Sequence, residues 1–139
     1  MLDAFACDFP ILTFDERVLS PALGYLFRDS WLNAHESIVA ILWKFAKFNT
    51  LPGHVVAGLL RAHHDPYQGV APTRAEVDIR RLRASLNLPL KTLRRSLIAP
   101  ALKGVNSPFF RFFPTCLSTG YHCVVHQHTA LQVCPVTSQ

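Results

Sequence analysis

The residues with the clearest potential for chemistry are cysteines and histidines near the end of the chain. Three of the four cysteines lie in the last 24 residues, and three histidines are interleaved with them: Cys116, Cys123, Cys134, His122, His126 and His128. Thiolate and imidazole are the ligands that zinc prefers in proteins. No Cys-x-x-Cys pair is present, however, and a single residue of either type is more often a buried thiol or a surface imidazole. The pattern therefore indicates a metal site without fixing its ligands.

A second candidate site is basic. The span 79–111 contains eight Lys or Arg residues and no Asp or Glu. Such a block favours an anionic partner, of which nucleic acid is the commonest. The candidate nucleic-acid-binding residues are Arg80, Arg81, Arg83, Lys91, Arg94 and Arg95. The alternative is a solvated helix face with no such partner.

No set of residues favours an enzyme. The G-x-S-x-G, P-loop and H-E-x-x-H motifs are all missing. A nucleophilic pair could combine Cys116 or Cys123 with His122 or His126. Because residues 79–139 contain no Asp or Glu, no side-chain carboxylate of the tail could orient such a histidine. We therefore expect no catalysis and no small-molecule substrate.

The length and composition of the chain indicate what kind of protein positions these groups. The chain has 139 residues, of which 50% are hydrophobic and 17% charged, as expected for one small globular domain. It contains no apolar run of the roughly 18 residues that a membrane span needs. The first residues lack a basic segment followed by an apolar one, so we expect neither a secretion signal nor a transit peptide. These features predict a cytoplasmic protein without membrane association.

Apolar periodicity predicts mainly α-helical structure. Helices are expected from Asn33, from His54 to Ala62, from Thr73, and after Pro89 to the residue before Pro100. The last two would be joined by the short turn Asn87-Leu88-Pro89, and a pair of this kind is compatible with a helix-turn-helix. Its second helix would then present Lys91, Arg94 and Arg95 to phosphates or bases. In the tail we expect a strand-prone run over 109–113 and a short helix over 121–133.

The tail resembles the zinc-finger part of the TniQ family, which comprises transposition-associated proteins of bacterial mobile elements. The resemblance is carried by Arg111-Phe112, Pro114, Cys116-Leu117, Gly120-Tyr121-His122, His126-Gln127, Leu131 and Cys134-Pro135. The stretch from Trp31 to Asn49, with its Glu36-Ser37 pair, is similar to the start of a TniQ domain. The resemblance runs from about residue 18 to the end of the chain.

Two departures from the family pattern concern the metal. Phe113 stands where the family has its first knuckle cysteine, and Thr137 where it has its last histidine. The resemblance therefore supplies Cys116 and Cys134 as zinc ligands. One alternative is that Cys123 and His122, His126 or His128 complete the site. The other is a degenerate finger without metal, held by packing of Phe109, Phe110, Phe112 and Phe113.

These observations together predict three parts: an irregular segment 1–30, a small helical TniQ-like domain 31–104 with a helix-turn-helix-like pair, and a degenerate zinc-ribbon-like tail 105–139. The resemblance implies a DNA-binding or adaptor protein of transposition, with DNA and transposase or targeting-complex proteins as partners. It also implies that the chain corresponds to a truncated, N-terminal portion of a family member. Two alternatives stay open. One is a protein-interaction module using Trp31, Trp43 and Phe45, and the other is a remnant of a mobile element without function.

Overall fold

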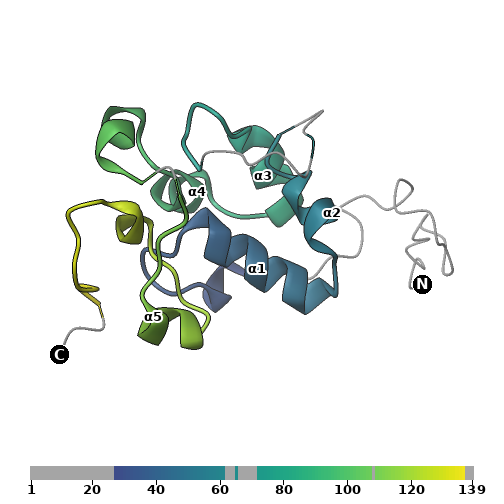
Figure 1. The fold of residues 1–139 in the computed structure, drawn as a ribbon. Helices are drawn as coiled ribbons and strands as arrows, with labels where there is room; N and C mark the ends of the chain where they lie inside the picture. The colour runs from purple at the N-terminus through teal and green to yellow at the C-terminus, as the bar shows by residue number, and fades with distance from the viewer. Residues whose placement is uncertain (1–26, 62–64, 66–71, 108, 137–139) are drawn as a thin grey trace, which may run out of the picture.

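The computed structural model describes residues 27–61, 65, 72–107 and 109–136, and these residues form a mainly helical protein (Figure 1). The α-helices are α1 (Ile38–Asn49), α2 (Gly53–Ala57), α3 (Ile79–Leu86), α4 (Leu90–Ser96) and α5 (Pro114–Ser118). Short 3-10 helices are η2 (Asp29–Trp31), η3 (Pro100–Val105) and η4 (Val124–Gln127). Within the described ranges β-pairing is limited to isolated bridges. The prediction of a mainly α fold is confirmed.

Helix α1 begins later than its sequence signals indicate. The Oγ atom of Ser37 accepts a hydrogen bond from the backbone N–H of Ala40 at 3.2 Å, so Ser37 is the N-cap. The predicted start at Asn33 is wrong, because His35 has a φ of 62° and interrupts any helix there. The Asn33 side chain instead donates to Oε1 of Glu36 at 3.0 Å.

The two basic helices form a hairpin. The capping signal at Thr73 produces only a single turn, in which its Oγ1 atom accepts from the N–H of Glu76. Helix α3 starts at Ile79 instead, since the Asp78 carboxylate accepts from the N–H of Arg81 at 3.0 Å. It ends at Asn87, whose φ of 52° turns the chain toward α4. Helix α2 is likewise shorter than expected, and Ala62 lies outside the described residues.

The main hydrophobic core lies where α1 meets the hairpin of α3 and α4. Its fully buried side chains include Ile38, Ile41, Phe45, Leu82, Leu86, Leu88 and Leu93. Leucines of α3 and α4 therefore pack into the core with α1, whereas the basic side chains of the same helices are exposed. Every helix among the described residues is too short to cross a membrane, since the longest, α1, has 12 residues.

The tail after η3 is irregular apart from α5 and η4. Its own small core consists of Phe113, Cys116, Tyr121, Cys123 and Cys134. The described tail residues form no β-hairpin, so a zinc-ribbon-like tail is not confirmed. The run over 109–113 is not a strand at its described positions, and the predicted helix over 121–133 shrinks to η4.

Most of the phenylalanines that were expected to pack together and hold the finger do not do so in the structure. Phe109, Phe110 and Phe112 are exposed, and only Phe113 packs into the small core of the tail. The predicted interaction patch is also altered, because Phe45 is fully buried whereas Trp43 is exposed. Of the irregular segment expected over 1–30, residues 1–26 lie outside the described part.

The tail lies against the N-terminal end of α1, as Figure 1 shows. The backbone N–H of Ser37 donates to the carbonyl of His122 at 2.7 Å, and Glu36 forms an isolated antiparallel bridge with Cys123. The Tyr121 hydroxyl donates to the carbonyl of Ala34 at 2.9 Å. These contacts fix the position of the tail relative to the helices.

Candidate functional site

The structure brings together three potential metal ligands in the tail. Cys116 comes from α5, His126 from η4, and Cys134 from the segment that follows η4. Their ligand atoms all lie within 4.8 Å of one another, and all three residues are buried. Tetrahedral zinc places ligand atoms about 3.5–3.8 Å apart, given bonds of about 2.3 Å to sulfur and 2.0 Å to nitrogen. Small side-chain movements would close the group around an ion, so it could hold a metal.

Both ring nitrogens of His126 have a polar neighbour, and these two contacts fix the orientation of the ring. Its Nδ1 atom accepts a hydrogen bond from the backbone N–H of Cys123 at 3.3 Å, and its Nε2 atom lies 3.1 Å from Sγ of Cys134. Burial lowers the pKa of His126 to about 4, with a further contribution from His122. The imidazole is therefore neutral at pH 7, as metal binding requires, but because Nδ1 accepts, the ring proton lies on Nε2, and an ion bound at Nε2 would displace this proton.

His122 is not part of this group. Its Nε2–H donates to the carbonyl of Arg111 at 2.7 Å, which leaves Nδ1 to accept a hydrogen bond from Oγ of Ser37 at 2.7 Å. Both ring nitrogens are thus used, and burial lowers the pKa of this histidine as well. Of the histidines that the sequence offered as substitutes, the structure places His126 beside the cysteines.

Cys123 is buried next to the group without belonging to it. It is the N-cap residue of η4, and its side chain accepts from the backbone N–H of His126. Phe113 packs beside the group, and its ring lies edge-on to that of His126 with the ring centroids 4.9 Å apart. Burial raises the pKa of Tyr121, and the thiols of Cys123 and Cys134 add to the effect. Tyr121 therefore stays a neutral phenol.

The candidate nucleic-acid-binding residues form the outer surface of the α3–α4 hairpin. All six are exposed: Arg80, Arg81, Arg83, Lys91, Arg94 and Arg95. A hollow of about 690 Å³ at the turn is lined by Arg80 and Arg83 together with Asn87 and Leu88. The structure thus brings Arg80 and Arg83 to one concave surface.

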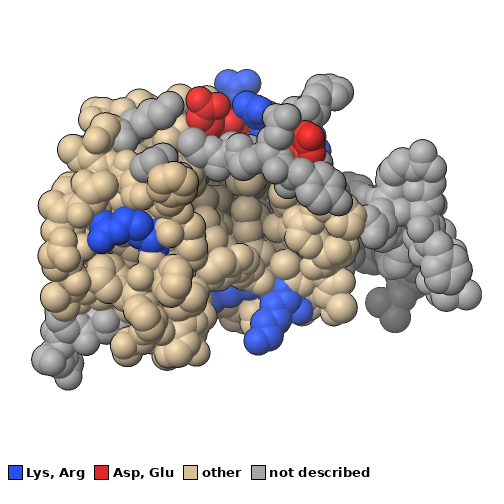
Figure 2. Space-filling view, viewed as in Figure 1, with Lys and Arg blue, Asp and Glu red and all other residues tan. Residues whose placement is uncertain are grey.

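The remaining basic residues differ in their surroundings. Nε of Arg81 donates to the carbonyl of Gly58 at 3.2 Å, so this side chain also ties α3 to the end of α2. Arg95 lines a different hollow, of about 220 Å³, which it shares with Asp29 and Glu36. In the face shown in Figure 2, Lys and Arg side chains are few and lie apart, and most of the surface is neither basic nor acidic.

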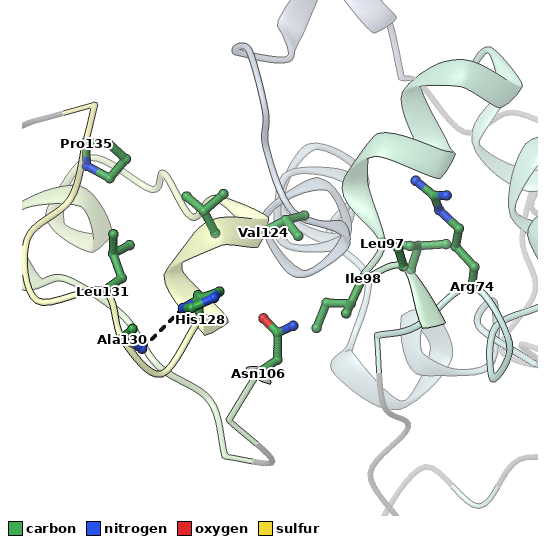
Figure 3. Close-up of a pocket in the computed structure, with 11 residues that line it drawn as sticks. Arg74, Leu97, Ile98, Asn106, Val124, His128, Ala130, Leu131 and Pro135 are labelled. Carbon is green, nitrogen blue, oxygen red and sulfur yellow. Dashed lines mark hydrogen bonds between the residues drawn. The ribbon is translucent and has the colours of Figure 1, made fainter. Parts of the chain in front are cut away.

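A mainly apolar cavity of about 530 Å³ separates the tail from α4 (Figure 3). Ile98 and Leu97 lie on one side, and Val124, His128 and Leu131 lie on the other. Nδ1 of His128 accepts from the N–H of Ala130 at 3.2 Å, and Nε of Arg74 donates to the carbonyl of Arg94 at 2.9 Å. His128 and Arg74 at this cavity therefore make hydrogen bonds within the local fold.

Comparison with known proteins gives no match: no family model, no curated protein and no solved structure is significantly similar to the chain. The fold and the site define a small, mainly helical protein with a buried Cys-His-Cys group that could hold a metal ion. The resemblance to the TniQ family is carried by the motifs quoted above alone.

Proposed function

We propose that the protein is a DNA-binding module whose helices α3 and α4 contact the phosphates of a duplex. The observation that carries the proposal is the exposure of all six basic side chains on two consecutive helices whose leucines form the core. A rigid hairpin with one apolar and one cationic face matches the charge of a phosphate backbone. The hollow between Arg80 and Arg83 adds a concave surface to this face.

The resemblance to the TniQ family extends this proposal to DNA transposition. In that role the protein would link DNA to transposase or targeting-complex proteins.

We further propose that the ion held by Cys116, His126 and Cys134 is zinc. Two thiolates and one imidazole form a donor set that suits zinc better than the hard cations magnesium and calcium. Because the three ligands come from α5, η4 and the following segment, the ion would join the separate pieces of the tail. The three residues would supply three of the four tetrahedral ligands of zinc, water would take the fourth position, and the ion would serve to join the tail.

The DNA-binding proposal is tested with charge variants that keep the fold. We expect Arg80→Gln with Arg83→Gln to weaken binding to a short fluorescent duplex, and to reduce the slope of log affinity against log salt by about 2. Arg28→Gln with Arg61→Gln removes the same charge from exposed positions outside α3 and α4. An equal loss in both double variants would show that only net charge matters, and would contradict the proposed interface.

A further inference from the structure

Three aromatic rings form a continuous exposed surface where α1 meets the segment before α5. We call Trp43, Phe110 and Phe112 the aromatic platform. The exposed fractions of these residues are 44%, 44% and 48%. The ring centroids of Trp43 and Phe110 are 5.7 Å apart, and those of Phe110 and Phe112 are also 5.7 Å apart with an interplanar angle of 26°. Phe109, next along the chain, is 79% exposed.

The backbone that presents these rings is fixed. The N–H of Arg111 donates to Oε1 of Gln127 at 2.7 Å, and Nε2 of Gln127 donates to the carbonyl of Phe109 at 2.9 Å. The Arg111 guanidinium donates to the carbonyls of His128 and Leu131. Ordered rings lose little conformational entropy on binding, so a preformed platform is favourable for a ligand.

The charge around the platform indicates the nature of its ligand. Neither α1 nor the tail over 104–136 contains an Asp or Glu residue. Lys47 is exposed and lies one helical turn after Trp43, on the same side of α1. The Arg111 guanidinium is directed to the carbonyls of His128 and Leu131, so the cation that accompanies the platform is Lys47. By contrast, Lys44 is paired with buried Glu36.

Exposed apolar rings beside a lysine, on elements without carboxylates, complement a polymer of flat bases and anionic phosphates. Each base offers a face that stacks on an aromatic side chain, and this contact tolerates any sequence. We propose that the aromatic platform binds unpaired nucleotides of single-stranded DNA, with bases on Phe112, Trp43 and the neighbouring Phe109. The inference rests on the proposed DNA-binding function and assigns a separate surface to unpaired bases.

The test compares two fluorescent oligomers of equal length and charge, one of thymidines and one of abasic sites. Stacking predicts that the wild-type chain binds the oligothymidine more tightly. We expect Phe112→Ala to weaken oligothymidine binding roughly five- to hundred-fold, the range for loss of one stacked base. Duplex binding should be unchanged, and Phe112→Trp should retain oligothymidine binding.

The matched control is Phe48→Ala. Phe48 is 55% exposed and also belongs to α1, but its ring contacts Trp31 rather than the platform. Equal affinity of the wild-type chain for the two oligomers would overturn the inference, and so would an unchanged oligothymidine affinity in Phe112→Ala. In either case the platform would bind a ligand other than nucleic acid. Either result leaves duplex binding through Arg80 and Arg83 intact, so the two proposals fail separately.

Discussion

Ser37 donates a hydrogen bond from its hydroxyl to Nδ1 of His122 across 2.7 Å, although the two residues are 85 positions apart in the sequence. The same Oγ atom accepts from the N–H of Ala40 and so caps α1. The other nitrogen of His122 donates to the carbonyl of Arg111. One serine thus joins the start of the first long helix to the tail that carries the metal group.

Ser37→Ala should therefore destabilise the protein more than the loss of an ordinary helix cap. Removing the cap costs about 1 kcal/mol. Leaving the buried Nδ1 atom of His122 without a donor costs about 1–3 kcal/mol more. We expect the free energy of unfolding, measured by urea titration, to fall by about 2–4 kcal/mol, the sum of these two effects.

The control for this substitution is Ser118→Ala. Ser118 is exposed, and its hydroxyl donates to the carbonyl of Thr115 within α5. Its loss should change the free energy of unfolding by less than about 0.5 kcal/mol. Similar effects in the two variants would mean that the contact between Ser37 and His122 does not hold the tail to α1.

The zinc site proposed at Cys116, His126 and Cys134 predicts close to one zinc ion per chain in protein purified without chelators. Cys134→Ser should abolish zinc binding and lower the free energy of unfolding by more than about 3 kcal/mol, because loss of a structural metal is among the largest single-site effects. Cys123→Ser should retain the ion, since Cys123 lies outside the ligand group. Elemental analysis and a thermal melt with chelator measure both effects.

Two results would contradict this assignment. Protein without zinc, whose melting temperature is insensitive to chelator, would mean that the three residues pack without an ion. Loss of zinc in Cys123→Ser but not in Cys134→Ser would mean that the ligand set differs from the one in the structure.

The two buried histidines predict acid sensitivity of the metal-free protein. Burial lowers the pKa values of His122 and His126, that of His126 to about 4. In the unfolded chain a histidine titrates near pH 6.5, so between about 6.5 and 4 the unfolded state binds more protons. The free energy of unfolding should be constant above this window and fall as the pH decreases through it. Urea titrations with chelator at several pH values measure this dependence.

A histidine variant serves as a control for the acid sensitivity. His126→Asn should reduce the slope of stability against pH within this window, because it removes a buried group that titrates there. A metal-free stability that does not change between neutral and acidic pH would contradict the buried, neutral state of these histidines.

The hairpin of basic helices depends on the leucines behind it. Leu93 in α4 is fully buried in the main core. Leu93→Ala should lower the free energy of unfolding by about 2–5 kcal/mol, the range for a fully buried leucine. Lys91→Ala, at an exposed position of the same helix, should change it by less than about 0.5 kcal/mol. Equal changes in the free energy of unfolding in the two variants would mean that α4 does not belong to the core.

The helices whose signals are local could be predicted from the sequence. The apolar spacing of Ile38, Ile41 and Phe45 predicted the buried side of α1, and Pro89 marked the start of α4. The starts of α1 and α3 were misplaced because a capping pattern does not reveal backbone angles. The left-handed residue His35 and the true cap Asp78 decide those positions.

The metal group was predictable only in part. Cys116 and Cys134 followed from their residue type and from the resemblance to the TniQ family. The third ligand depends on which histidine turns toward the cysteines. That choice is set by distant partners, since Ser37 and the Arg111 carbonyl hold His122 away, while the turn of η4 directs His126 inward. Contacts between residues so far apart leave no local pattern.

The most direct test of the account is the salt dependence of duplex DNA binding by the wild-type chain. If the six basic residues of α3 and α4 each neutralise one phosphate, log affinity should fall linearly with log salt with a slope of about −5. Binding that is absent at low salt, or that does not weaken as salt rises, would contradict the role of this surface in DNA binding.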